Sequence, residues 1–149
     1  MRKAFFFLLL ITTTVAGYSQ LNPVSWTYSA KKIADKTYEL HITATMQSGW
    51  HLYSQTQPED AIAEPTTVTF NKNPLLKFEG KVKEDGKMEK FHDAKLDLSA
   101  NQYSSTVKFV QVVKLKAKAK TNVSGSVRFQ TCNDEKCLPP KTITFNVAL

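Results

Sequence analysis

Apolar and polar side chains alternate without a break in the stretch Tyr38-Glu39-Leu40-His41-Ile42-Thr43-Ala44-Thr45-Met46. Successive side chains of an extended strand point to opposite faces of a sheet, so this period of two predicts a strand with one buried and one exposed face. An amphipathic helix would instead need apolar residues spaced by three and four positions. The stretch therefore predicts a protein built from β-sheet.

A second alternating run occupies residues 107–120. Val107, Phe109 and Val113 belong to its apolar face, and lysines fill most of the opposite face as far as Lys120. A lysine-rich face is typical of a strand surface in contact with water, and on an edge strand it opposes aggregation. We expect an edge strand with a solvated face here rather than a binding patch.

Other segments rich in β-branched and aromatic residues are bounded by turn residues, which predicts further strands. These segments are residues 24–29, 66–70, 75–82, 95–98, 123–131 and 142–147, with turns expected at 71–74, 84–86 and 121–122. No stretch has the spacing of a long helix. Many short strands with frequent turns predict an all-β fold, specifically an immunoglobulin-like antiparallel β-sandwich.

The chain has 149 residues, of which 42% are hydrophobic and 22% charged, the balance of one globular domain. Residues 1–19 combine Arg2 and Lys3, an apolar run and small residues, which is typical of a secretory signal cleaved near Ser19/Gln20. We therefore expect an exported domain over residues 20–149 with no membrane anchor after cleavage. The net charge of +7 would fall by two, to +5, on loss of Arg2 and Lys3. We nevertheless expect no nucleic-acid partner, because an exported chain rarely meets nucleic acid and this one has no cluster of aromatic and basic residues typical of an RNA-binding module.

Two cysteines, Cys132 and Cys137, flank a four-residue polar turn between the last two predicted strands. Cross-strand neighbours lie close enough for a disulfide, and an exported chain meets an oxidising compartment. Cys132 has the opposite parity to Val127 and Phe129, so we expect its sulfur to point away from the core, where another protein can reach it. Pro139-Pro140 then fixes the exit from the loop.

Local features leave three uses for this pair open. A bridge that closes so short a loop stabilises a fold by only about 2.2 kcal/mol, which favours redox exchange over a structural staple without deciding between them. The thiols and the histidines His41, His51 and His92 offer zinc ligands, but their spacing is a weak metal signal. The chain also lacks a Gly-rich phosphate loop and the hydrolase motifs, so we expect neither cofactor nor metal.

Three segments together resemble the N-terminal periplasmic domain of DsbD-type thiol:disulfide interchange proteins. Residues 129–140, which read Phe-Gln-Thr-Cys-Asn-Asp-Glu-Lys-Cys-Leu-Pro-Pro, resemble the cysteine hairpin of that family. Residues 49–53 (Gly-Trp-His-Leu-Tyr) resemble its aromatic segment near the active site, and residues 88–93 (Met-Glu-Lys-Phe-His-Asp) resemble its cap loop. The resemblance extends over most of residues 20–149.

The resemblance implies an immunoglobulin-like domain in the periplasm that exchanges disulfides without a cofactor, as a protein-disulfide reductase module. Cys132 and Cys137 would be the redox pair, with Cys137 holding the partner in a mixed disulfide. Phe91 and His92 would shield the sulfurs, and Tyr53 and His51 would line the site. Without the resemblance, Phe91 alone would be read as a core contact beneath a loop.

The resemblance also implies the partners, namely thioredoxin-like proteins and a membrane-embedded electron donor on another polypeptide, since the sequence ends at Leu149 soon after the last predicted strand. The electrons would serve disulfide reduction or cytochrome c maturation. His51 and His92 stand where better-known members carry tyrosines, and the loop between the cysteines is often one residue longer there. The alternative is a non-catalytic secreted interaction domain in which a structural disulfide ties one hairpin.

Overall fold

The computed structural model describes residues 22–95 and 97–149, which form eleven β-strands and no helix. The predicted signal segment, residues 1–19, lies outside the described residues. The strands are β1 (Val24–Ala34), β2 (Thr37–Met46), β3 (His51–Tyr53), β4 (Thr67–Phe70), β5 (Leu76–Gly86), β6 (Glu89–Asp93), β7 (Leu98–Tyr103), β8 (Thr106–Leu115), β9 (Asn122–Phe129), β10 (Thr131–Cys132) and β11 (Lys141–Ala148).

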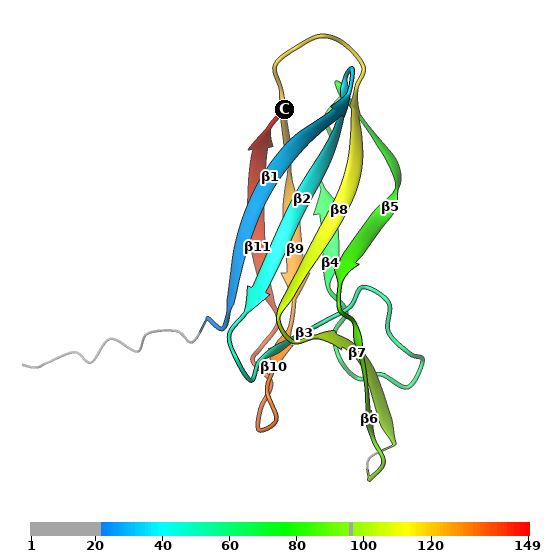
Figure 1. Ribbon diagram of the computed structural model, residues 1–149, viewed down its shortest axis with the longest axis vertical. Helices are drawn as coiled ribbons and strands as arrows, with labels where there is room; N and C mark the ends of the chain where they lie inside the picture. Colours follow the sequence, from blue (N-terminus) through cyan, green and yellow to red (C-terminus); the bar gives the residue numbers. More distant parts are fainter. Residues whose placement is uncertain (1–21, 96) are drawn as a thin grey trace, which may run out of the picture.

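Two antiparallel sheets face each other along the length of the molecule (Figure 1). One has the strand order β1-β2-β8-β5 and the other the order β11-β9-β4. Their inward side chains form one apolar core, in which Leu40, Phe109 and Val127 are fully buried and Phe145 is nearly so. The predicted fold class, an all-β immunoglobulin-like sandwich, is confirmed.

Aromatic pairs close the space between these sheets on both flanks. Trp26 on β1 lies against Phe129 on β9, with ring centroids 5.0 Å apart, and Phe70 on β4 stacks on Phe78 of β5 at 4.5 Å. Such large side chains bury much apolar area and add specific ring contacts. They fix the spacing of the two sheets without a disulfide between them.

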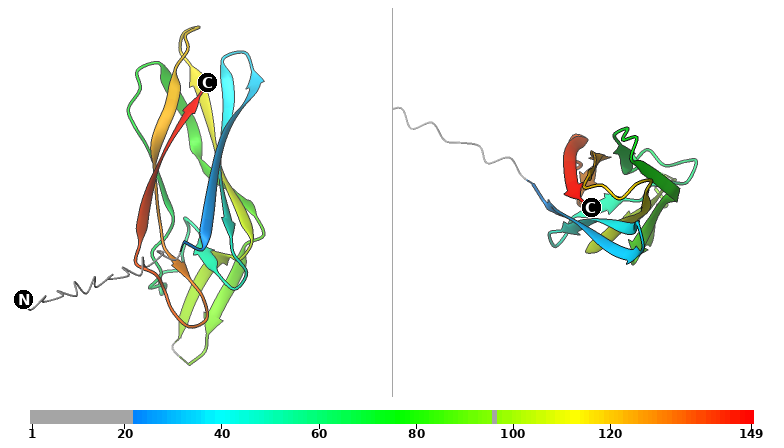
Figure 2. Two further views of the ribbon diagram at one scale, coloured as in Figure 1. Left: turned by 90° about the vertical axis from the view of Figure 1, so that its left-hand side faces the viewer. Right: turned by 90° about the horizontal axis from the view of Figure 1, so that it is seen from above.

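A third, small sheet with the order β10-β3-β7-β6 extends from one end of the sandwich. The same end carries the loop between β10 and β11, whereas the C-terminus lies at the opposite end (Figures 1 and 2). Strands β9 and β11 pair along their whole length, with Val127 opposite Ile143, and thereby bring both ends of the cysteine loop together. The sandwich is thus the support on which the small sheet and the cysteine loop are mounted.

The predicted strands at residues 24–29, 38–46, 66–70, 75–82 and 142–147 are confirmed within a few residues. The second alternating run forms β8 only as far as Leu115, and the expectation of an edge strand was wrong because β8 lies between β2 and β5. Its lysines face water and meet acidic groups of β5, with Lys114 Nζ 3.0 Å from a Glu79 carboxylate oxygen. Charge pairing across strands therefore accommodates lysines on a central strand.

Three local predictions were also wrong. Residues 84–86 are not a turn but the end of β5, where they pair with β8. The segment 95–98 is not a strand: Lys95 lies in a turn, in which its amide donates to Asp93 Oδ1, and Asp97 has a positive φ of 51°. The segment 123–131 divides at Gln130, because β10 leaves β9 to pair with β3.

In residues 22–95 and 97–149 there is no helix long and apolar enough to cross a membrane.

Candidate functional site

Cys132 and Cys137 form a disulfide at the tip of the hairpin that joins β10 to β11, with their Cα atoms 4.0 Å apart. The turn between them is held by its first residue: Asn133 Oδ1 accepts hydrogen bonds from the amides of Glu135 and Lys136. Beyond the turn, the Leu138 amide donates to the carbonyl of Thr131 at 2.9 Å. The predicted pairing of the two cysteines across a hairpin is confirmed.

The two cysteines differ in exposure. Cys132 is only 2% exposed and packs in a small cluster with Tyr53 and Ala100, separate from the main core. Cys137 is exposed. The expectation that Cys132 points away from the main core is confirmed. The expectation that another protein can reach it was wrong, because Tyr53 of β3 and Ala100 of β7 pack against it. The accessible cysteine is Cys137.

Strand β3 places two further predicted site residues beside the disulfide. Gly49, with φ of +78°, supplies the left-handed residue of the turn that leads into this strand, a conformation that costs glycine least. His51 is then directly opposite Cys132 in the antiparallel pairing of β3 with β10. Tyr53 lies two residues further on the same face, and its hydroxyl is hydrogen-bonded to His51 Nε2 at 3.3 Å.

Burial governs the titration of both side chains. It lowers the pKa of His51 below its usual value, although the negative charges of Asp134 and Glu89 act in the opposite direction. Burial also raises the pKa of the Tyr53 hydroxyl. At neutral pH, therefore, an uncharged imidazole and an uncharged phenol lie beside the disulfide.

Phe91 closes the site from the other side. Together with His51, Tyr53 and both cysteines, it lines a hollow of about 180 Å³. Phe91 remains 48% exposed, which is unlike the core contact that would be expected of it without the resemblance. The segment that carries it is not a loop, as the resemblance implied, but strand β6, which pairs with β7 to form a projecting hairpin (Figure 2).

His92 is not brought to this hollow. It is exposed, its Nδ1 lies 3.2 Å from Ser99 Oγ, and it lines a neighbouring hollow beside Gln57 and Pro58. Adjacent residues of a strand point to opposite faces, so Phe91 and His92 cannot both face the sulfurs. Gln102 of β7 and the loop residues Asn133 and Asp134 complete the cysteine hollow instead. No sequence motif pointed to Gln102.

A half-buried carboxylate joins the small sheet to the sandwich. Glu84 of β5 accepts hydrogen bonds from the Ser54 hydroxyl (2.6 Å), the Gln55 amide (2.7 Å) and the Tyr103 hydroxyl (3.0 Å). These contacts fix the chain directly after β3 and the end of β7. Glu84 was not predicted as a site residue, because it was expected in a turn and its partners are distant along the chain.

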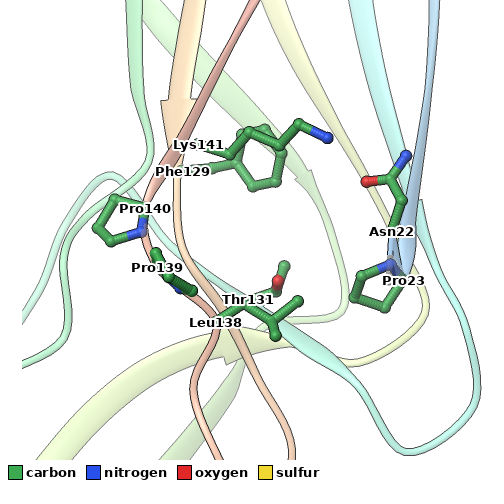
Figure 3. A pocket seen from close by; sticks show the side chains of 8 residues that line it. All are labelled: Asn22, Pro23, Phe129, Thr131, Leu138, Pro139, Pro140 and Lys141. Atoms are coloured by element: carbon green, nitrogen blue, oxygen red, sulfur yellow. The ribbon is translucent and has the colours of Figure 1, made fainter. Parts of the chain in front are cut away.

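The residues that follow Cys137 border another hollow, of about 410 Å³, shown in Figure 3. Leu138, Pro139 and Pro140 line it from the loop exit, and Pro23 and Phe129 line it from the sandwich. The two prolines restrict the backbone angles of the segment that leads into β11, and they have no amide hydrogen to donate. Residues 22–95 and 97–149 contain no group of three or more His, Cys, Asp or Glu side chains that could hold a metal ion.

Comparison with known proteins matches the amino-acid sequence to a family model. The family model described as the N-terminal part of thiol:disulfide interchange protein DsbD matches residues 20–149. The reduced DsbD N-terminal domain of Neisseria meningitidis is 15% identical, with a TM-score of 0.53 over 83% of this chain and 84% of that one. The DsbD N-terminal domain in complex with the PilB N-terminal domain, from the same organism, is 14% identical, with a TM-score of 0.52 over 86% and 87%.

A third structure, the N-terminal periplasmic domain of ScsB from Proteus mirabilis, is 13% identical, with a TM-score of 0.51. The likeness covers 83% of this chain but 44% of that one. No curated protein matches the sequence. At such low identities the structural likenesses show the fold alone, whereas the family model extends over all of residues 20–149. The chain therefore belongs to the family of DsbD N-terminal domains.

Proposed function

We propose that this domain carries out thiol:disulfide interchange through Cys132 and Cys137 and passes electrons between thioredoxin-like partners. The observation that carries the proposal is the asymmetry of the pair: an exposed cysteine bonded to a buried one, beneath an aromatic side chain and outside the main core. A partner sulfur reaches one cysteine, while the other is retained for the second step. Membership of the DsbD N-terminal family supports the same chemistry.

The exchange conserves atoms and electrons. In the reduced domain the Cys137 thiolate attacks one sulfur of a partner disulfide, and the other partner sulfur leaves as a thiolate that takes up a proton. Cys132 then loses its proton and attacks Cys137, which forms the intramolecular disulfide and releases the partner as a dithiol. Two electrons and two protons have passed to the partner, and the reverse sequence reloads the domain.

Partners and location are part of the proposal. The Neisseria DsbD N-terminal domain forms a complex with a PilB N-terminal domain, and the ScsB relative is a periplasmic domain. These likenesses and the signal-like residues 1–19 support a periplasmic protein with cleavage near Ser19/Gln20. We propose a membrane-embedded electron donor and thioredoxin-like acceptors, with disulfide reduction and cytochrome c maturation as the uses of the electrons. The domain would then be a cofactor-free protein-disulfide reductase module.

Phe91 is the side chain that we propose as the shield of the sulfurs, because it is the residue of β6 that lines their hollow. Tyr53 and His51 form the opposite wall. His92 points to the neighbouring hollow, so any contribution it makes to shielding is through the hairpin and not through contact with the disulfide.

The reduction potential of the Cys132–Cys137 pair tests the proposal. Protein equilibrated in graded dithiol and disulfide buffers is alkylated and weighed, and circular dichroism is recorded on each form. A potential between about −180 and −270 mV, with both forms folded, supports exchange with thioredoxin-like proteins. A potential below about −300 mV, or loss of the fold on reduction, would support the non-catalytic interaction domain with a structural bridge.

Trapping experiments test the order of the steps. The partner is a thioredoxin-like protein that keeps only the first of its two active-site cysteines, and this cysteine is first activated as a mixed disulfide with a small aromatic thiol. With Cys132→Ser, the remaining Cys137 is exposed, and we expect it to form a stable mixed disulfide with this partner. With Cys137→Ser, the remaining Cys132 is buried, and the trapped species should form much more slowly. Equal trapping by the two variants would contradict the assignment of Cys137 as the contact cysteine.

A further inference from the structure

We propose that His51 is the proton acceptor and donor of the cysteine pair. The proposal rests on the proposed function, because it assigns a role within the same exchange reaction. Each thiol must lose a proton before its sulfur can attack, and each departing partner sulfur must gain one. The domain therefore needs a group beside the sulfurs that takes up and returns protons near neutral pH.

The position of His51 meets this need. It pairs with Cys132 across β3 and β10, and both residues line the hollow that also contains Cys137. Side chains directly opposite each other on one face of an antiparallel pair have Cβ atoms about 4.5–5.5 Å apart, which brings an imidazole within reach of a thiol. Of the three histidines, His41 lies on the large sheet and His92 lines another hollow.

The surroundings of His51 suit a group that is uncharged at rest and charged for part of the reaction. Burial disfavours the imidazolium and keeps the resting ring neutral, with a lone pair available. The charged groups that face the ring are Asp134 of the cysteine loop and Glu89 of β6, and both stabilise the imidazolium once it forms. The remaining titratable neighbour on its own strand, Tyr53, is hydrogen-bonded to Nε2 and holds the ring in place.

The proton balance follows directly. As the attacking cysteine approaches the partner, its S–H bond breaks, the proton passes to a ring nitrogen of His51, and the sulfur keeps the electron pair. The new S–S bond forms as the partner S–S bond breaks, and the departing thiolate receives the proton from the imidazolium. The same ring then serves the other cysteine in the resolving step, so His51 ends each step neutral.

The test compares the pH dependence of alkylation in the reduced full-length domain. Each cysteine is followed by mass spectrometry during reaction with iodoacetamide between pH 5 and 9.5. An ordinary thiol is only a few per cent thiolate at pH 7, so we expect wild type to react about tenfold faster than His51→Gln at that pH. The two rates should converge near pH 9.5, where the thiols ionise without help.

The variant His41→Gln is the matched control, since it makes the same change on the large sheet, and its profile should coincide with that of wild type. If His51→Gln fails to fold, His51→Tyr carries the test, because tyrosine keeps a ring and a hydrogen-bonding group but takes up no proton near pH 7. Wild-type and variant profiles that coincide would overturn the proposal. So would a loss of rate that is equally large at pH 9.5, because that result indicates altered access alone.

Alkylation requires no protein partner, so the two proposals fail separately. A domain that does not exchange with thioredoxin-like proteins, but still shows the His51-dependent profile, loses the proposed function and keeps the proton acceptor. A domain that exchanges with them at equal rates in wild type and His51→Gln keeps the function and loses the proton acceptor.

Discussion

The two cysteines differ in exposure because they belong to different structures, although only four residues separate them. Cys132 ends a strand that pairs with β3, whereas Cys137 follows a turn that projects from the sandwich. Parity along the strand predicted that Cys132 leaves the main core. It did not predict that Tyr53 and Ala100, from the same small sheet, pack against Cys132 and bury it. Exposure at the residue scale therefore depends on a sheet that local sequence does not reveal.

Replacement of Phe91 by alanine should open the cysteine hollow. Phe91 is half exposed and lines that hollow, so its loss removes a shield at a stability cost of about 1 kcal/mol or less. We expect reduction of the disulfide by a small thiol to become about three- to tenfold faster, because access is one of the factors that set exchange rates. Met88→Ala, which removes an exposed apolar side chain just before β6 and outside the hollow, should leave the rate unchanged. Equal rates for all three proteins would show that Phe91 does not shield the sulfurs.

Tyr103 should make stability depend on pH in the alkaline range. Burial, and the neighbouring Glu84 carboxylate to which its hydroxyl donates, raise its pKa to about 12 from the ordinary 10. Below pH 10 the folded and unfolded states both keep the proton, so the contribution of the hydroxyl is complete. Between pH 10 and 12 the unfolded chain releases this proton and the folded protein keeps it, so stability falls as the pH rises.

Urea denaturation of wild type and Tyr103→Phe at pH 8, 10 and 11.5 measures this effect. Phenylalanine lacks the titrating hydroxyl, so the advantage of wild type over the variant should shrink across that window. The comparison cancels the titration of lysines and of other tyrosines. A difference in stability that stays constant with pH would show that the Tyr103 pKa is not raised.

At the scale of whole elements, long alternating stretches were predictable and short paired ones were not. Strands β2 and β8 repeat their pattern over ten residues each, and β-strand periodicity needs such length to be distinguished. Strand β3 has three residues and β10 has two, and each exists because a neighbour supplies the hydrogen bonds. The cysteines were singled out by their spacing between two predicted strands, and Phe91, Tyr53 and His51 were singled out through motif resemblance. Glu84 and Gln102 were missed because only the pairing of distant strands places them.

Strand β9 contains a close approach that permits no side chain. A Cβ atom built on Gly125 would lie 2.1 Å from the carbonyl oxygen of Thr69 and 2.7 Å from the ring of Phe145. The Thr69 carbonyl belongs to the backbone of β4, which pairs with β9, so it cannot shift without disturbing the sheet. The Phe145 ring is buried in the packed core and has little room to turn aside. We expect Gly125→Ala to destabilise the fold by about 2–3 kcal/mol, as overpacked cores do. Thermal unfolding checks this, with Ser126→Ala on the same strand as control; equal melting temperatures for the two variants would contradict it.

At the scale of the whole molecule, the fold and the cysteine pair are nearly independent. The main core joins the two large sheets and contains neither cysteine, and the disulfide closes a loop with a sequence separation of only five residues. We therefore expect the fold not to depend on the Cys132–Cys137 bond, as the proposed exchange between two redox states requires.

Removal of the disulfide should therefore cost little and leave cooperative unfolding intact. For Cys132→Ala combined with Cys137→Ala we expect a loss of about 2 kcal/mol in the free energy of unfolding, the value for so short a closed loop, and an unchanged dependence on urea concentration. Reduced wild type, kept in excess dithiothreitol, is the matched comparison, because it retains both side chains and lacks only the bond. Similar values for the two proteins would assign the loss to the bond itself. A loss of more than about 5 kcal/mol, or a broad non-cooperative transition, would show that the loop supports the sandwich, and the pair would then be a structural staple.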